Sequence, residues 1–290
     1  ASTATAAEGA GQRPSSAVLQ TELERVVAGF AGTVGVVVRG VEGGDSAQLQ
    51  AQAHLPMQSV YKFPLALAVL HAVDEGRLQL DQKIWLRPAD LLPNTWSPLR
   101  ERYPQGNVRV SLREVLRYTV AESDNNGCDM LFRLLGGPAA VQAYMHRLGV
   151  ADLRIAATEE EMHRQEDVQF KNWATPFAMS ELLVNFSRGH YLSAASHACL
   201  WQLLTTGPTG LQRLRAGVPT GTEVAHKTGT SGTNAAGLAT ATNDAGLLTL
   251  PNGRHVAVVV FITNSTASEA DRESLIAAVS RTAWQHFTAK

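Results

Sequence analysis

A serine and a lysine three residues apart, Ser59 and Lys62, are the first side chains in this sequence that could carry out chemistry. They open a long apolar run, which predicts a buried helix from Ser59 to about Glu75, ending at Gly76. On a helix, positions i and i+3 share a face, so the hydroxyl and the ammonium can point into one pocket. A desolvated lysine can help take the proton of a serine and activate it as a nucleophile. An isolated match of this kind is more often an ordinary serine near a helix start.

Two further polar triplets accompany the Ser59 segment. Ser123-Asp124-Asn125 falls in a polar break between two helical runs, and Lys227-Thr228-Gly229 falls on a predicted strand. Each triplet alone is common. Their order along the chain, and the kind of element that carries each, is the pattern of a serine acyl-transfer site.

Composition narrows the possible functions. The chain has 290 residues, 44% of them hydrophobic, and a formal net charge of −1. This length allows a large core, and the near-zero charge argues against a nucleic-acid partner. The sequence has no apolar run of membrane-spanning length and does not begin with a signal peptide. Its small, polar first ten residues are either what signal cleavage leaves behind or a disordered tail.

Metal and cofactor sites are not indicated. The two cysteines, Cys128 and Cys199, lie in apolar helical patterns and belong to no Cys-x-x-Cys pair. The default expectation is two buried free thiols, with a disulfide between them left open. The nine histidines form no His-Glu-x-x-His or His-x-His pattern, so we predict neither a metal nor a cofactor.

The predicted elements divide the chain into β-rich ends and a helical middle. Strands are expected at 33–39, 47–51, 223–230, 247–250 and 255–263, and helices at 16–30, 115–120, 127–135, 138–148, from 175, 193–204, 210–216 and 270–286. Residues 77–110 are loop-rich, and 151–175 show no clean period. We therefore predict an α+β fold, with a mostly antiparallel sheet flanked by helices. One α/β domain (1–55 and 205–290) would receive an inserted all-α domain (56–204), with the active site in the cleft between them.

With these three motifs the chain resembles, over nearly its whole length, the superfamily of class A β-lactamases and penicillin-binding proteins. The resemblance implies roles for the motif residues. Ser59 would be the nucleophile, and its backbone N–H with that of Thr230 would form the oxyanion hole. Lys62, or Glu159 through a water, would take the Ser59 proton. Ser123 would protonate the leaving nitrogen, Asn125 would bind Lys62 and the substrate amide, and Asp124 would fix its loop.

A glutamate on an irregular loop separates β-lactamases from enzymes that remain acylated. The class A pattern is Glu-x-x-x-Asn. Here Glu159 takes the Glu place and His163 stands where Asn is usual, with Glu160 and Glu161 as neighbouring alternatives. The resemblance therefore implies that Glu159 activates the water that removes the acyl group.

Substrate binding is also implied by the resemblance. Lys227, Thr228, Gly229, Thr230 and Ser231 would bind the substrate, including its carboxylate. No arginine lies between Ser231 and Asn243, so Arg213 would serve at the alternative place that other members use, unless it is an ordinary exposed helix charge. Trp96 would flank the mouth of the cleft.

Several segments look like the divergent extended-spectrum, PER- and VEB-like branch of class A. They are Asn94–Pro98, Glu159–His163, Asn172-Trp173 and Ala225–Gly232. We expect a periplasmic or secreted monomer whose partner is a β-lactam, including oxyimino-cephalosporins, rather than nucleic acid or a membrane. A DD-peptidase, or a β-lactam sensor that acylates without efficient turnover, is the alternative.

Overall fold

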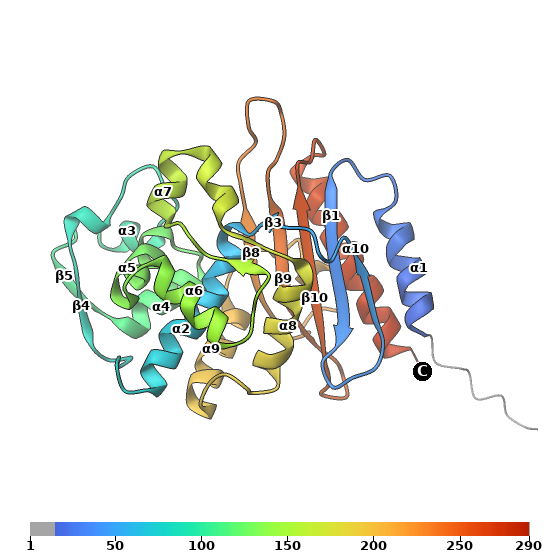
Figure 1. The fold of residues 1–290 in the computed structure, drawn as a ribbon, viewed down its shortest axis with the longest axis horizontal. Helices are drawn as coiled ribbons and strands as arrows, with labels where there is room; N and C mark the ends of the chain where they lie inside the picture. The colour runs from blue at the N-terminus through green and yellow to red at the C-terminus, as the bar shows by residue number, and fades with distance from the viewer. Residues whose placement is uncertain (1–14, 290) are drawn as a thin grey trace, which may run out of the picture.

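A computed structural model describes residues 15–289 of the protein (Figure 1). The small polar residues at the extreme N-terminus, which we considered as a cleavage remnant or a tail, lie outside this range. Within residues 15–289, no helix combines the length and apolarity that crossing a bilayer requires.

A five-stranded antiparallel sheet forms one half of the molecule, in the order β2-β1-β10-β9-β8. Both ends of the chain contribute to it: β1 (Thr33–Gly40), β2 (Ser46–Leu49), β8 (Val224–Thr230), β9 (Thr242–Thr249) and β10 (His255–Thr263). The connections within each group are short, and short connections join antiparallel neighbours. The predicted mixed fold with an antiparallel sheet is confirmed.

Alternating side chains of the central strands face two different cores. On β1, Val36 and Val38 pack with α1 (Ser16–Val27) and α10 (Glu269–Thr288), whereas Val37 belongs to the cluster on the other face. Figure 1 shows α1 and α10 together on one side of the sheet and the remaining helices on the other. Because both faces are covered, β10 is buried along nearly its whole length.

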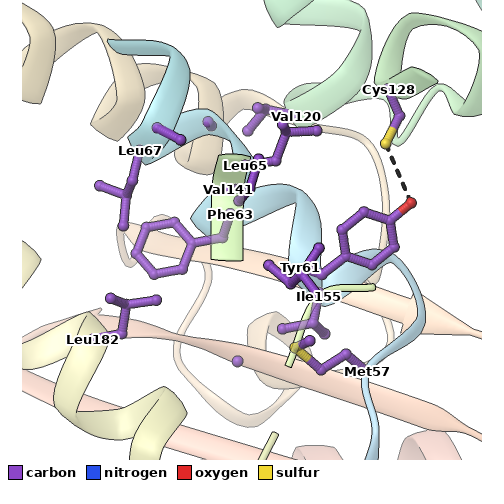
Figure 2. Packing of buried hydrophobic residues seen from close by; sticks show 14 of the residues in the cluster. Met57, Tyr61, Phe63, Leu65, Leu67, Val120, Cys128, Val141, Ile155 and Leu182 are labelled. Atoms are coloured by element: carbon purple, nitrogen blue, oxygen red, sulfur yellow. Dashed lines mark hydrogen bonds between the residues drawn. The ribbon is translucent and has the colours of Figure 1, made fainter. Parts of the chain in front are cut away.

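The chain between β2 and β8 is mostly helical. Its centre is α2 (Lys62–Asp74), which follows the 3₁₀ turn η1 (Gln58–Tyr61) and is buried nearly all round. Figure 2 shows Phe63, Leu65 and Leu67 of this helix among their neighbours. The surrounding helices are α3 (Pro98–Arg102), α4 (Leu112–Ala121), α5 (Asn125–Leu135), α6 (Pro138–Arg147), α8 (Pro176–Ser187) and α9 (Ala194–Thr206).

One hydrophobic cluster joins this helical region to the sheet. It runs from Phe63 of α2 to Val259 and Phe261 of β10. The division into domains at residues 55 and 205 stays a prediction.

Small elements connect the layers. They are β3 (Leu55–Pro56), β4 (Lys83–Leu86), η2 (Pro88–Asp90), β5 (Val108–Ser111), β6 (Leu153–Arg154), β7 (Trp173–Ala174) and η4 (Leu214–Gly217). The β4–β5 pair lies inside the stretch that we expected to be loop-rich, and its four-residue strands are too short to show a clear period.

Two sequence expectations are wrong. The stretch 151–175, for which we found no period, contains α7 (Glu159–Arg164) and the 3₁₀ turn η3 (Glu166–Lys171). A helix of six residues is too short to show a period, but Thr158 and Glu161 form a capping box that marks its start. The helix expected at 210–216 is only the 3₁₀ turn η4. The backbone of Gly210, which precedes this turn, is left-handed (φ +67°).

Two other element boundaries differ from those predicted from the sequence. The first helix ends at Val27 instead of Phe30, because Gly29 is left-handed (φ +73°). Strand β9 begins at Thr242, five residues before the apolar segment that predicted it. Its polar start is buried and hydrogen-bonded, which hydropathy alone does not indicate.

Candidate active site

Ser59 lies on η1, directly before α2 and against β8. The preceding residue, Gln58, has a left-handed backbone (φ +47°). Strand β8 approaches so closely that a Cβ at Gly229 would lie 2.3 Å from the Met57 carbonyl oxygen and 3.1 Å from the Ser59 nitrogen. Only a glycine permits this approach, which brings the Ser59 N–H beside the end of β8.

Lys62 is fully buried at the start of α2, and its ammonium joins the other two motifs. Nζ donates to the Ser123 carbonyl oxygen at 2.8 Å and to Asn125 Oδ1 at 2.6 Å. It also lies 3.4 Å from Ser123 Oγ and 3.5 Å from Glu159 Oε1. One cation therefore touches the polar turn and the glutamate loop together.

Hydrogen bonds to the Asp124 carboxylate hold the turn that carries Ser123. Ser123 has a left-handed backbone (φ +57°), and Asp124 caps α5 by accepting from the Gly127 N–H. The same buried carboxylate accepts from the Leu99 N–H and the Ser97 hydroxyl, and burial raises its pKa. Asp124 fixes the loop, as expected.

Lys227 on β8 approaches Ser123 from the opposite side. Its Nζ donates to Ser123 Oγ and to the Thr228 carbonyl oxygen, each at 3.0 Å. Burial, and after it the positive charge of Lys62, lowers the pKa of Lys227 well below its usual range. Ser123 Oγ therefore has two lysines within 3.4 Å and retains its own proton to donate elsewhere.

Arg213 is buried, only 3% exposed, and so is not an ordinary surface charge. Its guanidinium donates to Thr230 Oγ1 at 2.8 Å, to the Asn243 carbonyl oxygen at 2.9 Å and to Glu273 Oε1 at 3.2 Å. The arginine thus lies behind the end of β8 and orients the Thr230 hydroxyl. Since that hydroxyl accepts from Arg213, its proton can point away from the arginine.

A buried His226–Asp244 pair anchors the segment that carries Arg213. His226 Nδ1 lies 2.8 and 2.9 Å from the two carboxylate oxygens of Asp244. Asp244 also accepts from the Leu214 N–H, next to Arg213. The pair therefore ties η4 to strands β8 and β9.

Thr228 and Ser231 lie on either side of the Gly229-Thr230 pair. Thr228 is buried on β8, and Ser231 follows the strand. The Ser231 hydroxyl accepts from the Ala241 N–H at 2.8 Å and donates to the Gly232 carbonyl oxygen at 2.9 Å. These bonds close the base of the loop that connects β8 to β9.

Glu159 begins α7, and its carboxylate faces Lys62. Oε1 accepts from the Tyr61 hydroxyl at 2.7 Å. The N–H groups of Glu159 and Glu160 donate to the two carboxylate oxygens of Asp129, at 2.8 and 2.9 Å. Burial, and after it the negative charge of Glu159, raises the pKa of Asp129 to about 7.

The two alternative glutamates make other contacts. Glu160 pairs with Arg164 one turn on, and Glu161 completes the capping box with Thr158. Of the three, Glu159 is the one that reaches Lys62.

Two buried amides hold the rest of this loop. Asn172 Oδ1 accepts from the N–H groups of Ala156 and Ala157, at 2.8 and 3.0 Å, and its Nδ2 donates to the Ala157 carbonyl oxygen. Gln169 Oε1 accepts from Gln58 Nε2 at 2.7 Å and from the Thr240 hydroxyl at 2.9 Å. The loop is thus attached to the nucleophile segment and to the loop after β8, which lies at the same end of the molecule as α7 in Figure 1.

A cavity of about 470 Å³ lies between these elements. Asn125, Glu159, His163, Thr230 and Ser231 line it. Trp96 does not line this cavity. It is 58% exposed, and its indole N–H donates to the Glu122 carbonyl oxygen, whereas its neighbour Thr95 lines the cavity and accepts from Asn125.

Comparison with known proteins gives a consistent result. A model of the "Beta-lactamase enzyme family" matches residues 18–287. The β-lactamase VEB-1 of Pseudomonas aeruginosa is 40% identical over 274 residues, covering 94% of this chain and 91% of VEB-1. The extended-spectrum β-lactamase PER-1 of the same species is 41% identical over 270 residues, covering 93% and 87%.

The chain belongs to the β-lactamase family. The crystal structure of TLA-1 extended-spectrum β-lactamase superposes with a TM-score of 0.92 at 43% identity, covering 94% of this chain and 99% of TLA-1. The structure of a β-lactamase from Chitinophaga pinensis gives 0.90 at 48% identity, covering 92% and 98%. The protein is a class A serine β-lactamase of the PER/VEB-like branch.

Several residues that shape this β-lactamase site were not predicted from the sequence. They are Tyr61, Thr95, Asp129, Gln169, Asp244 and Glu273. None of them belongs to a motif with a fixed spacing in the sequence. The one signal that could have located the loop helix was the capping box that begins at Thr158.

The state of the cysteines was left open, and the structure answers it. Cys128 is buried beside Tyr61, Cys199 is half-buried, and both are free thiols.

Proposed function

We propose that this β-lactamase hydrolyses β-lactams through a covalent acyl-enzyme on Ser59, which a water activated by Glu159 then cleaves. The observation that carries the proposal is the contact of one buried ammonium, that of Lys62, with Ser123, Asn125 and Glu159. In this arrangement Glu159 is a proton acceptor, and Lys62 is one only when its amine is neutral.

Acylation would begin with attack of Ser59 Oγ on the carbonyl carbon of the lactam. Lys62, or Glu159 through a water, accepts the serine proton. The N–H groups of Ser59 and Thr230 stabilise the oxyanion, and Gly229 allows the two segments to approach. One such donor contributes about 2.7–4 kcal/mol in other enzymes.

Ring opening needs a proton on the departing nitrogen. Ser123 Oγ accepts from Lys227 and lies beside Lys62, so its own proton is directed to the substrate. Lys62 or Lys227 can then restore that proton.

Deacylation would use Glu159 as a general base, an effect worth about 10²–10⁴-fold in rate. The carboxylate lines the cavity one turn from His163, which stands where class A enzymes usually have Asn. The imidazole can donate or accept one hydrogen bond to the same water.

Substrate binding would use the end of β8 and Asn125. Lys227 Nζ and the hydroxyls of Thr228 and Thr230 would donate to the carboxylate, and Ser231, whose hydroxyl already donates to the Gly232 carbonyl oxygen, would line the cavity beside it. Arg213 acts on the carboxylate through Thr230 Oγ1, to which it donates. Trp96, next to the cavity-lining Thr95, would flank the mouth of the cleft. The similarity to extended-spectrum enzymes supports oxyimino-cephalosporins as substrates.

We also propose that the protein acts as a periplasmic or secreted monomer. A β-lactam must be destroyed before it reaches its target outside the cytoplasm, and residues of a single chain line the cavity.

The decisive experiment is mass spectrometry of the Glu159→Ala variant after mixing with a cephalosporin. We expect a persistent adduct on Ser59 and a kcat reduced by about 10²–10⁴-fold. The matched controls are Glu160→Ala and Glu161→Ala, which should turn over normally. A wild-type enzyme that gives one stoichiometric burst and no turnover would contradict the proposal and favour the DD-peptidase or sensor alternative.

A further inference from the structure

A tyrosine between the nucleophile and Lys62 makes direct contact with the catalytic glutamate. Tyr61 is fully buried, yet its hydroxyl donates to Glu159 Oε1 at 2.7 Å. Its ring packs 5.7 Å from that of Phe132, which fixes the direction of the phenol. The same oxygen of Glu159 lies 3.5 Å from the Lys62 ammonium.

A thiol stands on the other side of the phenol. Cys128 Sγ lies 3.2 Å from the Tyr61 oxygen. Figure 2 marks this contact with a dashed line. Burial is the largest of the causes that raise the pKa of both Tyr61 and Cys128 well above their usual ranges, so both groups keep their protons. Because the phenolic proton goes to the carboxylate, the thiol is the group that donates to the phenolic oxygen.

We infer that Tyr61 is a positioning residue for deacylation: its phenol holds Oε1 of Glu159 so that Oε2 is the oxygen available to the hydrolytic water. The inference rests on the proposed role of Glu159. A carboxylate held at one oxygen by a neutral donor and by a cation cannot rotate freely.

Other charged and titratable groups also face Glu159, and any pH dependence includes them. They are Lys62 of α2, Asp129 and Cys128 of α5, Lys227 of β8 and His163 of α7. Cys128 also loses its contact with the phenol when the hydroxyl is removed, so the double-mutant cycle below, rather than Tyr61→Phe alone, isolates the effect exerted through Glu159.

The test is Tyr61→Phe, which removes one oxygen and keeps the ring. We expect kcat and KM to fall together while kcat/KM stays close to the wild-type value, because slower deacylation lets the acyl-enzyme accumulate. At pH 7 the single-turnover deacylation rate should fall about tenfold. Acylation should fall by a similar factor only if Glu159 is also the acylation base.

Tyr144→Phe is the matched control. Its hydroxyl is equally buried and has no hydrogen-bond partner within the described part of the chain. We expect it to leave kcat and the deacylation rate unchanged. Thermal unfolding of both variants checks that each is folded.

A double-mutant cycle with Glu159→Gln makes the inference falsifiable. If Tyr61 acts through Glu159, Tyr61→Phe has no further effect on deacylation in the Glu159→Gln background. A Tyr61→Phe enzyme with the wild-type deacylation rate would overturn the inference. If Glu159→Gln itself fails to accumulate acyl-enzyme, the proposed function is wrong, which is a distinguishable result.

Discussion

Two walls enclose the cavity, and they are stabilised by different kinds of interaction. The strand wall, β8, pairs residue by residue with β9 from Val224 opposite Leu248 to Thr230 opposite Thr242. The loop wall, residues 156–172, depends instead on a few side chains. Asn172, Gln169 and Asp129 supply most of its connections to the rest of the site.

The difference indicates which changes each wall tolerates. In a ladder, the backbone makes the hydrogen bonds, so a side chain can change as long as the backbone stays in place. In the loop wall, one buried amide satisfies several backbone groups that would otherwise be unpaired. We therefore expect the strand wall to be sensitive to backbone displacement and the loop wall to single polar side chains.

The largest effect should come from Gly229→Ala in the strand wall. The added Cβ would meet two backbone atoms, the Met57 oxygen at 2.3 Å and the Ser59 nitrogen at 3.1 Å, and neither can move away cheaply. Displacing the Ser59 N–H removes an oxyanion donor, so kcat/KM should fall by about 10²–10³-fold. Steady-state kinetics with a chromogenic cephalosporin measures this.

Gly232→Ala is the control for that variant. A Cβ at Gly232 would have no neighbour within 4 Å. It should keep kcat/KM within a factor of about two of wild type, since an exposed change of this size costs little. Equal losses in the two variants would mean that the approach to Ser59 is unimportant.

In the loop wall, the corresponding change is Asn172→Ala. It would leave the N–H groups of Ala156 and Ala157 and the Ala157 carbonyl oxygen without their side-chain partner in a buried place. We expect the free energy of unfolding to fall by about 3 kcal/mol. We also expect kcat to fall, because Glu159 lies two residues after Ala157 in the chain. Urea denaturation and kinetics on the same samples measure both.

Asn252→Ala provides the comparison. Asn252 also accepts from a backbone N–H, that of Arg254, but in an exposed turn where water can replace it. A loss below about 0.5 kcal/mol is expected. If Asn172→Ala cost no more than this, side-chain anchoring would not explain how the loop wall is held.

The same difference between the walls explains what the sequence could predict. Strands have a period and helices have caps, so the elements that carry Ser59, Ser123 and Lys227 were located before the structure was known. The strand wall and its motif followed from local pattern. The antiparallel sheet followed from the short connections between the predicted strands.

The loop wall could not be predicted in this way, because its conformation depends on contacts between distant residues. Asp129 caps a helix thirty positions on, and Gln169 reaches Thr240 across the cavity. Such pairs have no spacing rule. Arg213 is a similar case, since only tertiary packing shows that it is buried behind Thr230.

A smaller effect is expected from Arg213→Ala, which tests whether the strand wall recognises the substrate carboxylate. The variant loses the bond that orients Thr230 Oγ1, so KM should rise about tenfold for substrates with a free carboxylate and much less for their methyl esters. Arg215→Ala is the control, because Arg215 donates to the carbonyl oxygens of Thr205 and Gly207, away from Thr230. An increase in KM that is equal for acid and ester would assign Arg213 a purely structural role.

The last prediction concerns Asp129 and the pH dependence of stability. Its pKa is raised from 3.8 to about 7 in the folded protein, so between these values the folded state binds a proton that the unfolded state lacks. This group therefore makes the free energy of unfolding fall as pH rises from about 4 to 7, by at most about 1.4 kcal/mol per pH unit. Asp129→Asn cannot titrate, so its unfolding free energy should depend less steeply on pH than that of wild type over this range. Parallel pH dependences for the two proteins would contradict the burial argument, and with it the idea that the loop wall keeps a buried carboxyl in order to hold the start of α7.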